Sequence, residues 1–289
     1  MSNLSPGTHA VTLLGTRLVY HVAGTGPVMI TQSGGPGVDY AYLRNPLLEQ
    51  HFTMVYPELP GTGESGPLPA GATYVDTYVD FLLALTDHLG TPRVHVLGHS
   101  HGGFIAQRFA LRHPDRVAGL ALYSTSPTTD EEFWAVERAE IVKYGERNAG
   151  NPELGTVMDA LGRFDSVQTD EEQTKVLRDC LPIYFADFWG RRDEFDSLRQ
   201  NVRGRHLQFE NSTFDYRPEL PSIIARTLAI TGRSDFICGP VWSEALHRGI
   251  AGSRLVILEN SGHFGSIEEP VAFRDAVTWL LHDEAQEDS

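Results

Sequence analysis

The stretch VHVLGHSHGG at residues 94–103 constrains the fold of this chain more than any other segment. Its apolar first half predicts a buried strand, and the residues that follow, up to 113, predict a helix. The turn between them contains G-x-S-x-G, in which a serine is exposed at the tip of a strand-to-helix turn. Gly98 and Gly102 have no Cβ, so the strand and the helix can approach closely on both sides of Ser100. The helix N-terminus adds unpaired N–H groups and positive potential beside the Ser100 hydroxyl.

Strand-like and helix-like segments alternate on both sides of this turn. Short apolar runs bounded by Gly, Pro and polar residues predict strands at 8–14, 17–23, 27–32, 51–56, 94–99, 117–123, 227–232 and 254–258. Apolar residues at helical spacing predict helices at 40–49, 73–89, 103–113, 240–250 and 270–281. This alternation favours an α/β fold with a mostly parallel central sheet and helices on both faces. In such sheets the functional residues lie at the carboxyl ends of the strands.

Residues 127–220 differ in character from the rest of the chain. Strand signals vanish there, and helix-forming stretches broken by Gly and Pro take over. Aromatic residues are frequent, and a small helical subdomain needs most of them for its own core, while a minority is expected to face a ligand pocket. We therefore expect a core formed by residues 1–126 and 221–289, with residues 127–220 inserted as a helical cap.

Serine is a weak nucleophile, so it needs a base that is itself oriented by an acid. Asp235 follows the strand predicted at 227–232, and His263 follows the strand predicted at 254–258. Both residues stand in loops at the carboxyl ends of strands, downstream of Ser100 in the order Ser, Asp, His. This order and placement predict a catalytic triad of Ser100, Asp235 and His263.

Acyl transfer to a serine places negative charge on the carbonyl oxygen, and two backbone N–H groups usually stabilise that charge. The N–H of His101, at the start of the helix, is the expected first donor. The second is expected from the glycine loop GGPG at residues 34–37, which follows the third predicted strand. We favour Gly35 as this donor, with Gly34 as the alternate.

Three histidines lie near the serine in sequence. The spacing of His95, His99 and His101 approaches the metal-binding pattern H-x-H-x-D-H, but positions 103 and 104 hold Gly and Phe in place of the Asp and His that the pattern requires. We therefore expect no metal and no cofactor. His99 and His101 are instead expected to line the active site.

The charge and the cysteine content narrow the possible partners and the compartment. The net charge of −15 argues against nucleic acid or an anionic membrane as a partner. Cys180 and Cys238 show neither metal-ligand spacing nor a disulfide framework, which favours a reducing cytoplasm. Residues 1–10 lack the features of a signal peptide, and no apolar run approaches the ~20 residues of a membrane span. These features predict a cytoplasmic protein that acts on a small molecule or a short peptide.

The whole pattern resembles the α/β-hydrolase superfamily over almost the full length of the chain. Three segments are similar to the proline iminopeptidase (prolyl aminopeptidase) branch: GGPG at 34–37, ENSTF at 210–214 and GRSDFIC at 232–238. The resemblance implies an aminopeptidase acting through an acyl-enzyme on small substrates with a free amino terminus. It also implies that Glu210 binds the substrate α-amino group and that Cys238 is a structural thiol near the site. Apolar residues expected to contact the substrate are Tyr184, Trp189 and Phe264.

Other positions depart from that branch. Ser33 stands where the branch has His, His101 stands where it usually has Trp, and ELPGTG at 58–63 replaces its D-Q-R-G-x-G segment. The last of these resembles esterases and lactonases, so a carboxylesterase or lactonase acting on an uncharged small molecule is the alternative. A second alternative is a non-hydrolytic ligand-binding or lyase member, because a fold does not determine a function.

Overall fold

An eight-stranded sheet lies at the centre of the computed structural model, which describes residues 2–207 and 213–281. The strands lie in the order β1-β2-β4-β3-β5-β6-β7-β8. The pairs β1–β2 and β2–β4 are antiparallel, and the other neighbouring pairs are parallel. The strands are β1 (Gly7–Leu13), β2 (Thr16–Ala23), β3 (Val28–Gln32), β4 (Thr53–Glu58), β5 (Val94–His99), β6 (Val117–Tyr123), β7 (Arg226–Gly232) and β8 (Arg254–Leu258). The predicted strands and the mostly parallel α/β fold are confirmed.

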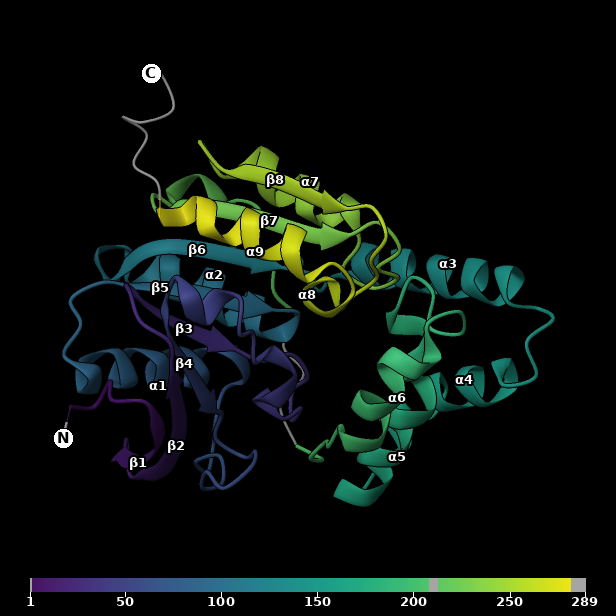
Figure 1. Cartoon of the computed structure of the whole chain (residues 1–289), viewed down its shortest axis with the longest axis horizontal. Coiled ribbons are helices and arrows are strands. Elements are labelled where there is room, and N and C mark those ends of the chain that lie inside the picture. The colour runs from purple at the N-terminus through teal and green to yellow at the C-terminus, as the bar shows by residue number, and fades with distance from the viewer. Residues whose placement is uncertain (1, 208–212, 282–289) are drawn as a thin grey trace.

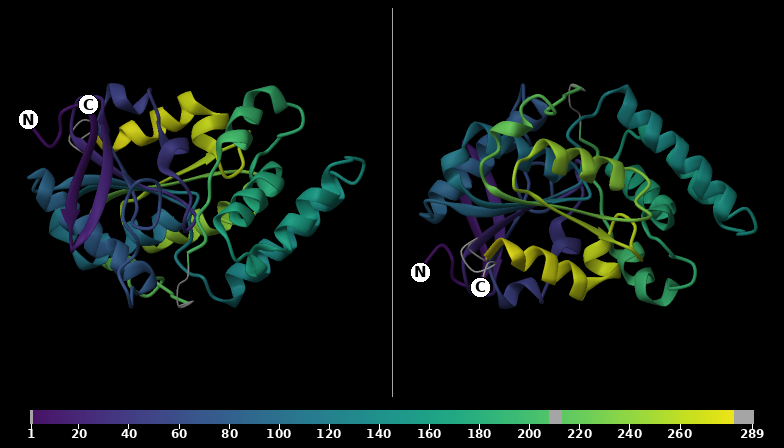
Figure 2. Two further views of the ribbon diagram at one scale, coloured as in Figure 1. Left: turned by 90° about the horizontal axis from the view of Figure 1, so that it is seen from below. Right: turned by 90° about the horizontal axis from the view of Figure 1, so that it is seen from above.

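Helices cover both faces of this sheet (Figure 2). α1 (Tyr74–Leu89), α2 (His101–Arg112) and α7 (Pro240–Gly249) contribute to one apolar cluster with the strands, and α9 (Pro270–Thr278) contributes to a second cluster on the opposite face. Because both faces are covered, the central strands are apolar on both sides, and every residue of β3 and β5 is buried. This explains why neither strand alternates between buried and exposed residues.

The chain between β6 and β7 carries the helices α3 (Glu131–Arg147), α4 (Leu154–Leu161), α5 (Asp170–Cys180) and α6 (Arg192–Asn201). Side chains cap two of them, because Asp130 accepts the N–H of Phe133 before α3 and Thr169 accepts that of Glu172 before α5. Figure 1 shows these helices beside the core, at the side toward which the arrowheads of β7 and β8 point. The cap therefore stands at the carboxyl ends of the parallel strands.

The helix predicted at 40–49 is wrong. The structure has two short 3₁₀ turns there, Tyr40–Leu43 and Leu48–Gln50. Pro46 has no N–H and disfavours helical backbone in the residue before it. Asn45 instead accepts the N–H groups of Leu47 and Leu48 with its side-chain oxygen, which starts the second turn. The predicted final helix is also shorter, since α9 ends at Thr278 and continues as a 3₁₀ turn, Trp279–Leu281.

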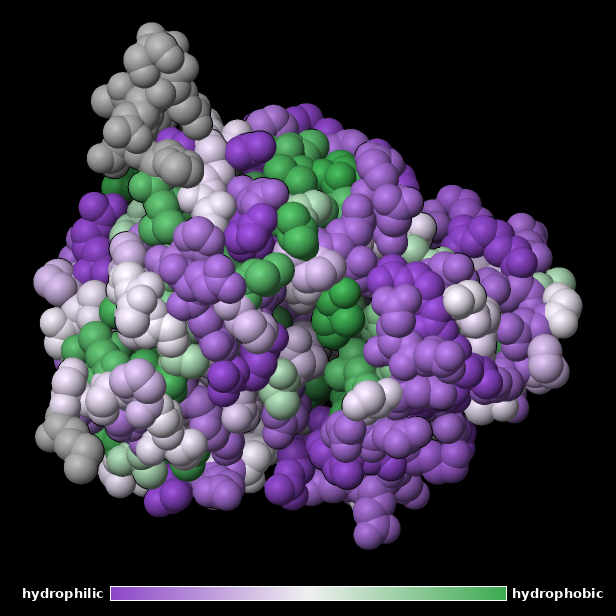
Figure 3. Space-filling model, viewed as in Figure 1, coloured by the Kyte–Doolittle hydropathy of each residue, from purple (hydrophilic) through white to green (hydrophobic). Residues whose placement is uncertain are grey.

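The surface shows where the core and the cap meet. On the face drawn in Figure 3 the outside of the cap is predominantly hydrophilic, whereas hydrophobic residues gather at the junction between cap and core. Among residues 2–207 and 213–281, no helix has both the length and the apolar character needed to span a membrane.

Candidate active site

The backbone around Ser100 is strained in the way that an exposed nucleophile requires. Ser100 has φ 54° and ψ −120°, a conformation that side chains rarely adopt, between the end of β5 and the start of α2. Its N–H donates to the carbonyl oxygen of Tyr123 at 3.0 Å. A Cβ on Gly102 would overlap the carbonyl group of Gln32, and a Cβ on Gly98 would overlap that of Gly102. Both glycines are therefore needed for this close approach of helix and strand.

Asp235 and His263 form a buried pair. His263 Nδ1 lies 2.9 Å from Asp235 Oδ2, and the two residues are only 3% and 4% exposed. Asp235 Oδ1 accepts the N–H groups of Ile237 at 3.1 Å and Cys238 at 2.9 Å. Burial acts to raise the pKa of Asp235, but the adjacent His263 and these hydrogen bonds outweigh it, so the pKa is lowered. The carboxylate is thus ionised and oriented toward the imidazole.

The loop that carries His263 is held by the cap and by a second buried acid. The N–H of His263 donates to the carbonyl oxygen of Tyr184 at 2.7 Å. Glu268 accepts the N–H of Gly262 at 2.7 Å and that of Ala186, in the cap, at 2.8 Å. Burial raises the pKa of Glu268 to about 7. Sequence reasoning missed this residue, because its position beside the start of the last helix is typical of a helix-capping acid.

The glycine loop lies directly beside the serine. A Cβ on Gly34 would stand 3.2 Å from the Cβ of Ser100. The N–H of Gly34 donates to Tyr42 Oη at 2.6 Å, so this alternate oxyanion donor is already engaged. Gly35 has φ 118°, which favours glycine, and its N–H makes no hydrogen bond within the described residues. Of the two glycines, Gly35 is the one whose N–H is available.

The three histidines near Ser100 occupy separate environments. His95 packs edge-on against Phe52, and the His101 ring packs against Tyr78 at 5.5 Å. Burial lowers the pKa of His101 to about 4. His99 is 1% exposed, and its Nδ1 and Nε2 contact Tyr42 Oη and the His263 carbonyl oxygen. Neither ring nitrogen of His99 is left for a substrate, which corrects the expectation that this side chain lines the pocket.

The other predicted contact residues divide into three groups. The Tyr184 and Phe264 rings lie beside His263, with centroids 5.4 and 5.6 Å from the imidazole. Trp189 packs against apolar clusters of the cap and the site, with the guanidinium of Arg192 above its ring at 5.1 Å. Glu210 lies outside the described residues.

Neither cysteine forms a disulfide, and both thiols are buried. Burial raises the pKa of the Cys180 thiol to about 12 and that of the Cys238 thiol well above its usual value, so neither is a reactive thiolate near neutral pH. Within the two described ranges, 2–207 and 213–281, no three His, Cys, Asp or Glu side chains are grouped so that they could hold a metal ion.

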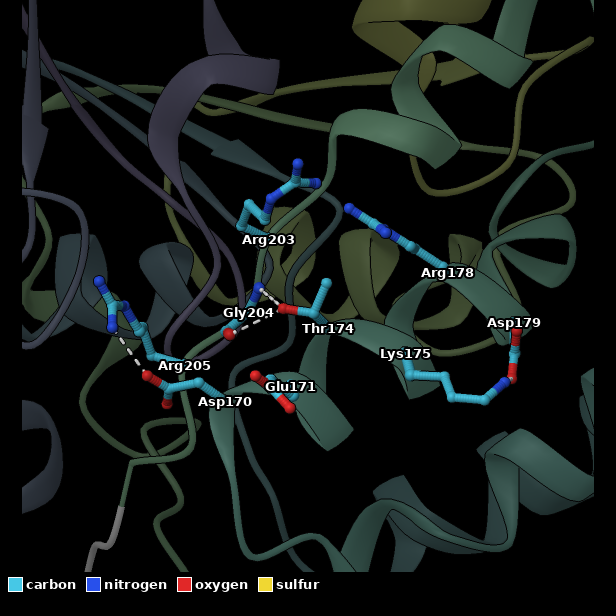
Figure 4. A pocket seen from close by; sticks show the side chains of 9 residues that line it. All are labelled: Asp170, Glu171, Thr174, Lys175, Arg178, Asp179, Arg203, Gly204 and Arg205. Carbon is cyan, nitrogen blue, oxygen red and sulfur yellow. Dashed lines mark hydrogen bonds and ion pairs between the residues drawn. The ribbon is translucent and has the colours of Figure 1, made fainter.

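A hollow of about 670 Å³ lies between α5 and the strand-like segment 203–205, and sequence reasoning did not foresee it. The segment is hydrogen-bonded to the glycine loop, because the N–H of Arg205 donates to the Gly37 carbonyl oxygen at 2.9 Å. The ends of the Arg178 and Arg203 side chains point toward each other there (Figure 4). Both donate to one acceptor, the Val202 carbonyl oxygen, at 3.3 and 3.0 Å.

These two guanidinium groups make no ion pair with any described residue. Three acidic side chains also line the hollow: Asp170 pairs with Arg205 at 2.7 Å, Asp179 pairs with Lys175 at 2.6 Å, and the exposed Glu171 makes no ion pair with a described residue. Two adjacent guanidinium groups that form no ion pair with a described residue, in a chain of net charge −15, are an arrangement suited to a carboxylate or another oxyanion. No sequence motif marks the pair, because Arg178 and Arg203 converge only through the fold of the cap.

Comparison with known proteins gives both a family and individual relatives. The family model described as alpha/beta hydrolase fold matches residues 27–270. A 2-hydroxy-6-oxononadienedioate/2-hydroxy-6-oxononatrienedioate hydrolase of Klebsiella pneumoniae is 26% identical over 270 residues, covering 89% of this chain and 88% of that protein. The protein of the same name from Escherichia coli is 26% identical over 273 residues, covering 92% and 91%.

Solved structures give the same fold. An enol-lactonase from Burkholderia xenovorans has a TM-score of 0.71 at 24% identity and covers 95% of this chain and 100% of its own. An esterase from Thermogutta terrifontis has a TM-score of 0.69 at 24% identity, with 95% and 97% covered. The relatives named here include no aminopeptidase.

Proposed function

The chain belongs to the α/β-hydrolase fold family, and from this premise we propose that it is a serine hydrolase that cleaves an ester or lactone of a small, carboxylate-bearing molecule. The proposal takes the esterase or lactonase alternative in preference to the aminopeptidase. It also replaces the expected uncharged substrate with an anionic one.

In the proposed reaction the Ser100 hydroxyl attacks the substrate carbonyl carbon while His263 accepts its proton. Asp235 holds the imidazole in the required tautomer and stabilises the imidazolium that forms. The tetrahedral intermediate collapses as the bond to the leaving oxygen breaks, and His263 gives its proton to that oxygen. Water then attacks the acyl-enzyme by the same steps, which releases the acid and restores the Ser100 hydroxyl.

The negative oxygen of each tetrahedral intermediate is assigned to the N–H groups of His101 and Gly35. The position of His101 at the first residue of α2, directly after Ser100, supports the first assignment, because the positive end of the helix dipole stabilises an anion there. The second is supported by the proximity of the glycine loop to Ser100 and by the engagement of the Gly34 N–H with Tyr42.

The observation that carries the proposal is the buried contact between His263 and Asp235 at 2.9 Å, on loops next to the strained turn that exposes Ser100. A purely structural Asp–His pair gives no reason for a positive φ at a serine between two obligatory glycines. The combination is what nucleophilic catalysis requires.

The anionic substrate is inferred from Arg178 and Arg203. Their guanidinium groups face a hollow whose wall is hydrogen-bonded to the glycine loop, and we infer that a carboxylate held there belongs to a substrate that extends from the hollow to the serine. The names of the curated relatives, which are those of dioate hydrolases, agree with this chemistry. A short dicarboxylic half-ester or a carboxylated lactone has both required groups.

The test is a panel of rates on purified protein, with Ser100→Ala as the blank. It contains 4-nitrophenyl esters of short monocarboxylic acids, 4-nitrophenyl half-esters of dicarboxylic acids, a lactone with and without a carboxylate, and proline 4-nitroanilide with its N-blocked analogue. The proposal predicts ester or lactone turnover, with higher kcat/KM for the carboxylated members. Turnover of the free-amine anilide alone would restore the aminopeptidase and a role for Glu210. No turnover by folded protein would favour the non-hydrolytic alternative.

A further inference from the structure

We propose that Tyr42 and His99 form a hydrogen-bond relay that connects the glycine loop, the strand of the nucleophile and the loop of the base. In this inference, which rests on the proposed function, both are positioning residues that set the geometry of the groups around Ser100. Nothing in the sequence motifs assigns a role to Tyr42, which lies in a 3₁₀ turn after the glycine loop.

Three hydrogen bonds make up the relay. The N–H of Gly34 donates to Tyr42 Oη at 2.6 Å, and Tyr42 Oη lies 2.8 Å from His99 Nδ1. On the other side of the same ring, His99 Nε2 lies 3.0 Å from the carbonyl oxygen of His263. Because His99 is the last residue of β5, the side chains of His99 and Tyr42 together connect the two loops to the strand that ends at Ser100.

The direction of each hydrogen bond follows from the groups themselves. The His263 carbonyl oxygen can only accept, so His99 Nε2 must carry a proton and donate it. In the neutral ring Nδ1 is then an acceptor, and the Tyr42 hydroxyl supplies the donor. That hydroxyl is in turn the acceptor for Gly34 N–H. Each donor in the relay then has one acceptor. All three hydrogen bonds form only when His99 is the Nε2–H tautomer.

The surroundings of His99 favour the neutral ring that this arrangement requires. Its centroid lies 4.4 Å from that of Tyr123 and 4.5 Å from that of His263. Burial, followed by the positive charge that His263 can carry, lowers the pKa of His99 well below its usual value. A neutral neighbour matters because His263 becomes an imidazolium in each half of the reaction, and a second cation at this distance would oppose that step.

The relay explains how the glycine loop, the strand that ends at Ser100 and the His263 loop are held at fixed positions relative to one another. It holds Gly34, and with it the neighbouring Gly35 N–H, relative to the strand that ends at Ser100. It also fixes the His263 backbone at its carbonyl oxygen, while Tyr184 fixes the N–H and Asp235 fixes the ring. The base is therefore held from the cap, from the acid and from the nucleophile strand, which is the preorganisation that proton transfer needs.

The test compares Tyr42→Phe with a matched control, Tyr56→Phe. Tyr56 is buried, whereas Tyr42 is partly buried, and the Tyr56 Oη likewise accepts a backbone N–H, from Asn45 at 3.2 Å, and donates to a side chain, Glu49 at 3.1 Å. Each change removes a hydroxyl group that accepts one hydrogen bond and donates another, so the two changes should lower the Tm to a similar extent. The relay predicts that Tyr42→Phe alone lowers kcat, about tenfold or more, with little change in KM.

Two further readouts separate this inference from the proposed function. The rate at which a fluorophosphonate labels Ser100 should fall in Tyr42→Phe and stay at the wild-type value in Tyr56→Phe. Wild-type protein that is not labelled would overturn the proposed function and the relay with it. Labelling and kcat that are equal in the two variants would overturn only the relay.

A measurement on the wild-type protein keeps the relay testable even if Tyr42→Phe does not fold. Long-range ¹H–¹⁵N correlation spectra distinguish the two neutral tautomers of a histidine ring. The relay predicts the Nε2–H tautomer for His99, identified by its absence from the spectrum of His99→Gln. The Nδ1–H tautomer, or a protonated ring at neutral pH, would contradict it.

Discussion

At the scale of single residues, the site depends on a few residues whose conformation and charge are determined by their neighbours. Ser100 occupies a strained turn because Gly98 and Gly102 allow the helix and the strands to close around it. Asp235 is ionised although buried, because hydrogen bonds and His263 compensate for the loss of water. The motifs pointed to these residues, and their catalytic roles are a proposal that substitution tests.

The first prediction concerns Asp235. Asp235→Asn keeps the size of the side chain, but the amide oxygen must accept the two backbone N–H groups that Oδ1 accepts now, so the amide NH2 faces His263 Nδ1. The imidazole then loses its preferred tautomer and the support for its positive charge. We expect kcat to fall by about 10³–10⁴-fold, with little change in KM, when ester hydrolysis is measured under saturating substrate. A decrease of less than about tenfold would mean that Asp235 does not serve His263 in the reaction.

The second prediction concerns Gly102. Gly102→Ala places a Cβ against the backbone of Gln32, so α2 must move away from β3 and carry Ser100 and His101 with it. We expect a loss of about 1–3 kcal/mol in the free energy of unfolding, together with a kcat/KM lower by more than about tenfold.

The control for this change is Gly155→Ala. Gly155 is the second residue of its helix, as Gly102 is, but an added Cβ would meet no atom within 4 Å. Alanine there should be neutral or stabilising by up to about 1 kcal/mol in the same denaturant titrations. Equal effects at the two glycines would show that the close approach at Gly102 is not required.

At the scale of elements, the sheet brings the ends of β3, β5, β7 and β8 together, and the cap reaches them through the loop of His263. The strands were predictable because each is a short apolar run with Gly, Pro or polar residues at its ends. The helix at 40–49 was not, because its apolar spacing is real but Asn45 and Pro46 interrupt it. Tyr42 and Glu268 could not be identified, since each also bonds a residue from a distant part of the chain, His99 and Ala186.

The third prediction belongs to the contact between the cap and the His263 loop. Glu268 has a pKa raised from 4.5 to about 7 by burial, so the folded state keeps a proton that the unfolded state loses. Its contribution to stability is therefore fully present below about pH 4.5 and is lost as the pH rises through about 7. The nearby Arg191 opposes this shift of the pKa and Glu269 adds to it.

Glu268→Gln should remove this dependence, because the amide is neutral at every pH. The free energy of unfolding of the wild type, minus that of the variant, should fall by up to about 3 kcal/mol between pH 4.5 and 7 in denaturant titrations. A difference that stays constant over this range would show that folding does not raise the pKa of Glu268.

At the scale of the whole molecule, a strongly acidic chain holds a small region of uncompensated positive charge. The net charge is −15, yet Arg178 and Arg203 share one carbonyl acceptor and pair with no acid among the described residues. Composition indicated only that anionic macromolecules are poor partners. Composition could not reveal that Arg178 and Arg203 converge, because their convergence depends on how α5 and segment 203–205 pack together.

The fourth prediction concerns these two arginines. Arg178→Gln and Arg203→Gln should each raise KM for a carboxylated ester by about five- to tenfold, because a charge-assisted hydrogen bond is lost in a half-exposed site. KM for the methyl ester of the same compound should not change. Arg147→Gln, at the exposed end of α3 and outside the hollow, serves as the control. An equal change of KM for the neutral ester would exclude a role in carboxylate recognition.

The most direct test of the central claim is the site at which a fluorophosphonate reacts. The protein is treated with the reagent, and the adduct is located by intact mass and by mass spectrometry of peptides, with Ser100→Ala and His263→Ala treated in parallel. The account predicts one adduct, on Ser100, that is absent from Ser100→Ala and forms far more slowly in His263→Ala. A folded wild-type protein that stays unmodified, or an adduct at another residue, would contradict it.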